Sequence, residues 1–146
     1  PFFNFVVKVG EEYTSIDLKN RSDADQKEVA DLPPEWENAY LPAFVPDGFQ
    51  IRQAETLQLT KMIQYGNDDG ETIVFQQKDG SNVNTRVDTE NADTEEITIN
   101  GQEGLLIEKE SRTTLIWQKD DLLYSLMSED VDKAILIQMA ESIEKN

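Results

Sequence analysis

A block near the end of the chain, Thr114 to Ile143, constrains the fold more than any other part of the sequence. It contains two strand-like runs separated by a turn signal, followed by an amphipathic helical stripe. No catalytic signature lies inside it. The block is therefore typical of a compact extracellular-type module and argues against a recognisable enzyme.

The two strand-like runs predict a hairpin with a definite register. A two-residue turn at residues 120–121 pairs Trp117 with Tyr124. The same register pairs Leu115 with Leu126, farther from the turn. All four side chains then share one face, because side chains alternate along a strand. Asp-Asp is a weaker turn signal than Asn-Gly, so a loop of about three or four residues stays an alternative.

The end of the block predicts a helix that packs on the sheet. Ser128 is a candidate N-cap, and Glu129 and Asp130 are expected in the first turn, where carboxylates favour the helix dipole. Apolar side chains then recur at helical spacing in two adjacent rows. The rows are Val131, Ile135 and Met139, and Leu136, Ala140 and Ile143. Such a wide apolar stripe favours packing over a free, partner-binding helix.

Upstream, the chain from Gln50 onward predicts a succession of strands separated by turns. The expected strands are Ile51–Leu59, Met62–Tyr65, Thr72–Gln77 with Ile73 and Phe75 on one face, an edge strand Ser81–Val87, and the two strands within Ile97–Ile107. The expected turns are Asn67–Gly70, Asp79–Gly80 and Asn100–Gly101. Asn100–Gly101 is the strongest hairpin signal, because Asn-Gly favours a type I′ turn.

Successive strands without intervening helices indicate an antiparallel sheet, and flanking helices make the fold class α+β. We expect about six to eight strands in successive hairpins, packed by a C-terminal helix and an N-terminal helical segment. We expect residues 1–31 to form an N-terminal segment and linker, and residues 32–146 to form a single α+β domain. Residues 1–13 fit a helix or a strand, and we favour the helix.

The segment Leu32–Phe49 is rich in proline and aromatic residues. Pro34 begins a predicted short helix that ends before Pro42, and Pro46–Gly48 is a predicted turn. Exposed aromatic rings here would form a ligand platform, but such rings more often fix a loop to the core, which is the interpretation that we favour. These residues are Trp36, Tyr40, Phe44 and Phe49.

The chain is strongly acidic, with 13 basic and 30 acidic residues and a net charge of −17. Such a surface repels phosphate backbones and anionic membranes, so we expect no nucleic-acid partner. The chain has no cysteine and no histidine, which excludes thiolate chemistry, Ser-His-Asp catalysis and nearly all zinc catalysis. We therefore predict no enzyme activity, no catalytic residues and no cofactor.

Two alternatives use the carboxylates. The acidic run Asp88–Glu96 is typical of a solvated face or mobile loop, but a calcium site there stays open. A pair of carboxylates at a suitable separation can hydrolyse a glycoside. A cell-wall-associated hydrolase is therefore the alternative function.

Several short motifs, taken in order, resemble an uncharacterised family. They are Tyr40–Pro42 with Val45–Phe49, Ile99–Gly104, Thr114–Trp117, Leu123–Leu126 and Ala140–Ile143. The family is found mainly in Clostridia and other Firmicutes and is known only as a domain of unknown function. The opening residues also resemble the segment that follows the single transmembrane helix of family members.

The resemblance implies an exported, C-terminal domain of a single-pass bacterial membrane protein, on the cell-surface side of the membrane. Some family members resemble anti-sigma regulators. No catalytic residue is carried over, because the family has none established. We therefore expect a non-enzymatic extracytoplasmic sensing or interaction domain whose partner is a protein or a cell-envelope ligand. Its site residues stay open, with residues 32–49 and the acidic run as the places to search.

Overall fold

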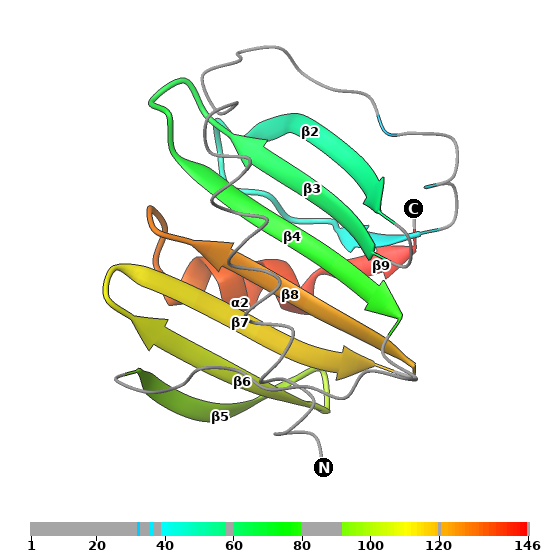
Figure 1. Cartoon of the computed structure of the whole chain (residues 1–146), viewed down its shortest axis with the longest axis vertical. Helices are drawn as coiled ribbons and strands as arrows, with labels where there is room; N and C mark the ends of the chain where they lie inside the picture. Colours follow the sequence, from blue (N-terminus) through cyan, green and yellow to red (C-terminus); the bar gives the residue numbers. More distant parts are fainter. Residues whose placement is uncertain are drawn as a thin grey trace.

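The computed structural model of the chain describes residues 32, 36, 39–57, 60–79, 92–119 and 121–145. Within them, a seven-stranded antiparallel sheet is accompanied by a two-stranded sheet and a helix (Figure 1). The large sheet contains β2 (Gln50–Leu57), β3 (Thr60–Gly66), β4 (Thr72–Asp79), β5 (Asp93–Ile99), β6 (Gln102–Lys109), β7 (Arg112–Lys119) and β8 (Leu122–Ser128). The small sheet pairs β1 (Tyr40–Pro42) with β9 (Ile143–Lys145), and the helix is α2 (Lys133–Glu141). The antiparallel sheet with a C-terminal helix confirms the expected α+β outline.

The strand order in the large sheet is β2-β3-β4-β8-β7-β6-β5. Two meanders, β2 to β4 and β5 to β8, join where β4 pairs with β8 (Figure 1). Phe75 lies opposite Leu126 at this junction. The predicted succession of hairpins is confirmed within each meander. The β4–β8 pairing is not a hairpin, and local turn signals do not predict it.

The β7–β8 hairpin has the register that its sequence predicts. Trp117 pairs with Tyr124, and Leu115 pairs with Leu126. The last pair before the turn is Lys119 with Leu122, so residues 120 and 121 connect the strands. The two-residue connection is therefore confirmed over the longer alternatives.

The main hydrophobic core lies between the large sheet and α2. The Tyr124 ring stacks between the rings of Phe75 and Trp117, at centroid distances of 6.1 and 5.5 Å. The helix contributes Leu136, Met139 and Ala140, each with 0% of its surface exposed. The expected packing of the helix on the sheet is confirmed.

Two predicted turns have the backbone geometry that their residues favour. Asn100 and Gly101 both have positive φ, at 50° and 84°, as a type I′ turn requires. In the other turn, the Phe49 N–H donates to the Pro46 carbonyl at 3.1 Å, and Gly48 has a φ of 87°. A glycine adopts this conformation without a steric cost.

The start of α2 differs from the prediction. Ser128 is the last residue of β8 and not the helix N-cap, because α2 begins at Lys133. The Ser128 hydroxyl donates to the Thr72 carbonyl at 2.7 Å and accepts from the N–H groups of Asp130 and Val131. The carboxylates expected in the first turn therefore precede the helix. A serine hydroxyl can bond to the backbone of a turn between two elements as readily as it caps a helix. The presence of a serine before the apolar helical stripe therefore did not decide where the helix begins.

The end of α2 also differs. The helix ends at Glu141, and Ile143 begins β9 instead of extending the apolar helical row. The Ser142 hydroxyl donates to the Met139 carbonyl at 2.7 Å, and the Ala43 N–H donates to the Ser142 carbonyl at 3.1 Å. A three-residue strand is too short to show an alternating pattern, so the sequence gives no signal for β9.

The short helix predicted from Pro34 does not extend to Tyr40, which begins β1. Trp36 lies in a 3₁₀ turn, in which its carbonyl accepts from the Ala39 N–H at 3.0 Å. The residue before a proline favours an extended backbone, which is consistent with a strand leading to Pro42.

Some interpretations lie outside the described residues. They concern the N-terminal segment 1–31, including its predicted helix, and the edge strand Ser81–Val87. Within the part of the chain that the structure describes, no helix has the length and apolar character needed to cross a membrane.

We predict that Leu136→Ala destabilises the fold by about 2–5 kcal/mol, because it leaves a cavity under the sheet. Denaturant unfolding of the purified protein measures this change. Gln138→Ala is the control, because Gln138 is exposed on the same helix and should change stability by less than about 0.5 kcal/mol. Equal effects of the two substitutions would contradict the packing of α2.

Candidate functional site

The aromatic residues of the segment 32–49 serve the core. Trp36 is fully buried, and its indole N–H donates to the Thr56 hydroxyl at 3.1 Å. Tyr40, Phe44 and Phe49 are partly buried and pack against the main core. The interpretation that these rings fix the segment to the core is therefore confirmed.

The acidic run Asp88–Glu96 is described only from residue 92 onward. Asp93 to Glu96 form the first part of β5 with exposed side chains, so this part is a strand and not a loop. Across the described ranges, no group of three or more acidic side chains is placed to hold a metal ion. Because part of the run lies outside those ranges, the calcium site stays a prediction.

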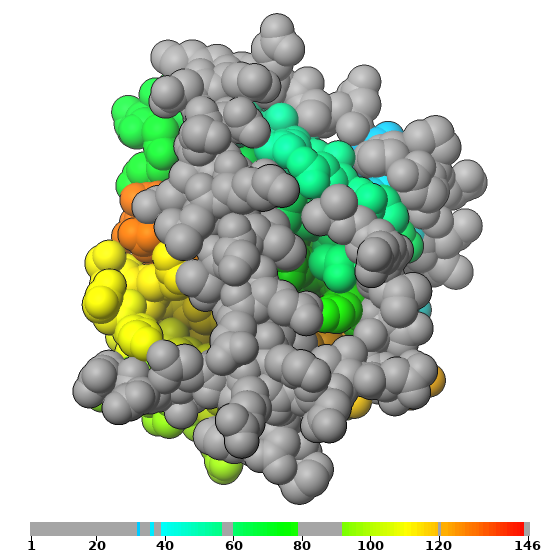
Figure 2. Space-filling view, in the orientation of Figure 1, coloured from blue at the N-terminus to red at the C-terminus, as the bar shows by residue number. Residues whose placement is uncertain are grey.

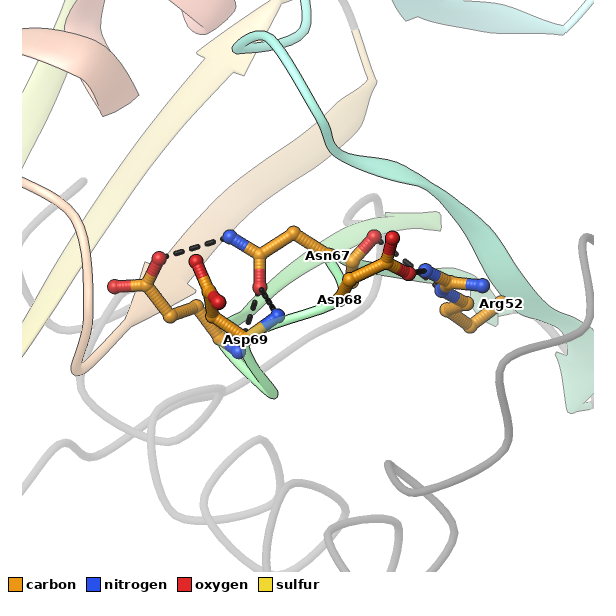
Figure 3. Close-up of polar contacts among 6 residues, drawn as sticks. Arg52, Asn67, Asp68 and Asp69 are labelled. Carbon is orange, nitrogen blue, oxygen red and sulfur yellow. Dashed lines mark hydrogen bonds and ion pairs between the residues drawn. The ribbon is translucent and has the colours of Figure 1, made fainter.

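The loop between β3 and β4 is a compact polar turn (Figure 3). The Asn67 side-chain carbonyl accepts from the N–H groups of Asp69 and Glu71, and its amide donates to the Glu71 carboxylate at 2.8 Å. Arg52 reaches the loop from β2 and lies 3.3 Å from the Asp68 carboxylate. These groups satisfy one another locally, as in other turns built on an asparagine side chain. The predicted turn at Asn67–Gly70 is confirmed, and its role is structural.

The sheet face opposite α2 buries a second set of side chains, which we call the mixed face because it combines polar and apolar residues. Its members on β3, β4 and β8 include Met62, Gln64, Val74, Gln76, Ser125 and Met127. Their side chains alternate along the strands with those of the main core, such as Ile73 and Phe75. None of the six has more than 3% of its surface exposed.

Two rows of paired residues organise the mixed face. In one row, Gln76 lies between Met62 and Ser125, its partners on the neighbouring strands. In the next row, Val74 lies between Gln64 and Met127. Met62, Val74 and Met127 form an apolar cluster, so the polar side chains are distributed around it.

Gln76 is the unusual member of the mixed face. Its side-chain nitrogen Nε2 is buried and has no hydrogen-bond partner among the residues that the structure describes. A buried donor without an acceptor costs about 1–3 kcal/mol, so native structures contain few of them. An oxygen atom placed near Nε2 would relieve this cost. Gln77 also has a buried atom without a partner, Oε1, but its side chain points to the α2 side, opposite Tyr124.

A carboxylate lies at the β2 end of this face. Glu55 pairs with Met62 and so lies in the same row as Gln76. The Gln53 side-chain amide, on the same side of β2, donates to the Glu55 carboxylate. The row therefore runs from the half-buried Glu55 carboxylate to the buried Gln76 amide.

Sequence reasoning missed Gln64 and Gln76 as site residues. Alternation along Thr72–Gln77 places Ile73 and Phe75 in the core and thus Gln76 on the other face. A polar residue on that face is ordinarily solvated, and a half-buried strand gives the same pattern. The missing information was that both faces of the central strands are buried, which depends on tertiary structure.

We predict that Gln76→Met maintains or raises the free energy of unfolding, by up to about 3 kcal/mol, because it removes an unpartnered donor at nearly constant volume. Denaturant unfolding measures the change. Gln102→Met, at an exposed position of β6, is the matched control and should stay within about 0.5 kcal/mol of the parent protein. A clear loss of stability in Gln76→Met alone would contradict the absence of a partner.

Comparison with known families identifies the chain at the family level. No curated protein matches it. The family model described as "Domain of unknown function (DUF4367)" matches residues 39–143, which contain the whole large sheet and α2. The expectation of a domain-of-unknown-function family is confirmed. The chain belongs to the DUF4367 family.

Proposed function

We propose that the domain is a non-enzymatic sensing or interaction module, held on the extracytoplasmic side of the membrane by the membrane-anchored bacterial protein to which it belongs. The mixed face, which is buried in this state, is its ligand-responsive region. The observation that supports this role most directly is the buried Gln76 amide, for which the described part of the chain supplies no hydrogen-bond acceptor.

The unpartnered amide links ligand binding to the state of the domain. In the free domain, the unpartnered Gln76 amide raises the free energy of the folded state. A ligand oxygen that accepts a hydrogen bond from Gln76 Nε2 lowers that free energy again. A ligand that binds one state preferentially shifts the population toward that state. The methionines beside Gln76 add an adaptable surface, because an unbranched thioether side chain repacks easily.

The net charge of −17 fits a tethered domain that stands clear of the membrane surface. An acidic domain is repelled by anionic lipid headgroups, so a tethered copy stands away from the bilayer and leaves its surface open to partners. The resemblance of the opening residues to a membrane-proximal segment supports the same placement. A regulatory, anti-sigma-like role for the parent protein agrees with it.

A carboxylate-pair hydrolase stays a prediction that rests on the abundance of acidic residues. Thirty acids make a pair at glycosidase spacing easy to find by chance, so abundance alone gives the hydrolase little weight.

The placement predicts that protease added to intact bacterial cells removes an epitope tag fused to the C-terminus of the full-length parent protein. The tag is detected by immunoblotting before and after treatment. A cytoplasmic protein with the same tag is the control and should be cleaved only after lysis. A tag that survives in intact cells and is lost on lysis would place the domain inside the cell and overturn the proposal.

The regulatory role predicts that deleting the parent gene changes a defined set of transcripts, measured by RNA sequencing. A strain that carries Gln76→Met should reproduce part of that change, whereas Gln102→Met should match the wild type. A deletion that leaves all transcripts unchanged under envelope stress would contradict regulation. A deletion phenotype without a Gln76→Met phenotype would instead exclude the mixed face as the responsive region.

A further inference from the structure

The outer edge of β5 is long and regular, and no other described strand pairs with it. β5 ends the large sheet, and among the described strands it pairs only with β6, over an unbroken register. The opposite edge, β2, is different, because its register shifts between Ile51 and Gln53. Such an irregularity twists an edge and hinders the addition of another strand. Atoms of β5, coloured yellow-green, reach the surface at the lower end of the view in Figure 2.

The turn between β5 and β6 decides which backbone groups face outward. Asn100 and Gly101 form a two-residue turn, so Ile99 and Gln102 are the hydrogen-bonded pair next to it. Hydrogen-bonded and open positions then alternate along β5. The residues whose N–H and C=O groups point away from β6 are Thr98, Glu96 and Thr94. Their spacing matches the hydrogen-bonding repeat of an added strand.

The charge along this edge selects the partner. Asp93, Glu95 and Glu96 are exposed on β5. On β6, Glu108 lies opposite Asp93, and Glu103 lies opposite Thr98. A second copy of this chain pairing through β5 would bring two such acidic runs to about 5 Å from each other. That repulsion disfavours a homodimer through this edge. A strand rich in lysine or arginine would place opposite charges across the same distance.

We propose that the open edge of β5 binds a basic, extended segment of a partner protein as an eighth strand of the sheet. Main-chain hydrogen bonds to Thr94, Glu96 and Thr98 supply affinity, and the carboxylates select basic side chains over neutral or acidic ones. The proposal rests on the domain's being an interaction module, and it names the partner's chemistry. It does not involve the mixed face.

The test uses a fluorescent peptide of about seven residues that alternates lysine with valine or threonine. We expect its fluorescence anisotropy to rise on titration with the protein. A peptide with the same lysines, but with proline in place of the other residues, carries the same charge and cannot form a strand. It should bind at least tenfold more weakly. Equal binding of both peptides would mean attraction by charge alone and would overturn the proposal, as would no binding of either peptide at low salt.

Hydrogen exchange locates the contact. On saturation with the lysine–valine peptide, exchange of the Thr94, Glu96 and Thr98 amides should slow at least tenfold, because these amides gain acceptors. The Glu95 and Ile97 amides, which face β6, should change much less. Uniform changes, or changes elsewhere on the surface, would show that the peptide does not extend the sheet at β5.

A pair of substitutions separates backbone from charge. Glu96→Gln removes one carboxylate and should weaken the peptide several-fold, with the weakening reduced at high salt. Glu96→Pro removes the same charge and also the central outward N–H, so it should weaken the peptide at least tenfold further. Circular dichroism checks that both variants fold. If Glu96→Pro does not fold, the comparison of peptides and the exchange pattern still decide the proposal.

The outcome for the β5 edge can be separated from the outcome for the proposed function. If the peptide tests fail, but the tag is accessible to protease and Gln76→Met has a phenotype, peptide binding at the β5 edge is rejected and the proposed function stays in place.

Discussion

The pairing of β4 with β8 is the contact on which the rest of the fold depends. It joins two meanders that are each locally specified and gives the central strands buried neighbours on both sides. Tyr124 on β8 stacks on Phe75 of β4 and on Trp117 of β7, so one ring spans the junction. At one end, the hydrogen bonds from Ser128 to Thr72 and from Thr72 to Asp130 fix the register. The long sequence separation of β4 and β8 makes this contact costly in chain entropy, and the buried aromatic rings offset that cost.

Local chemistry made part of the fold predictable. The Asn100–Gly101 turn and the Trp117–Tyr124 register follow from turn preference and side-chain alternation, and both are confirmed. Where one signal fits two structures, prediction failed: Ser128 bonds the β8–α2 connection and does not cap the helix. The β4–β8 pairing and β9 have no local signal, because they depend on which distant strands meet. The helix was predicted to end near Ile143 and instead ends at Glu141.

The candidate site was harder to predict than the fold. The aromatic segment 32–49 attracts attention in the sequence because of its rings, and those rings are used to hold it to the core. Gln76 attracts none, since a glutamine in a strand is ordinary. Its significance comes from burial on a face that a two-layer fold would normally expose, combined with an amide that finds no acceptor within the described ranges. A sequence pattern records alternation along a strand, but it does not record whether the second face is covered.

The small β1–β9 sheet has a mechanical consequence. Its two strands are antiparallel, so Tyr40 and Lys145 lie at the same end of a pair that has three residues in each strand. Trp36 anchors the chain before β1 in the core, so tension on the chain after β9 would load that end of the pair first. The pair would open one position at a time, from Lys145 toward Ile143, before the force reached α2. The β1–β9 pair would thus open first under this load. Its opening would lengthen the chain while the seven-stranded sheet stays intact.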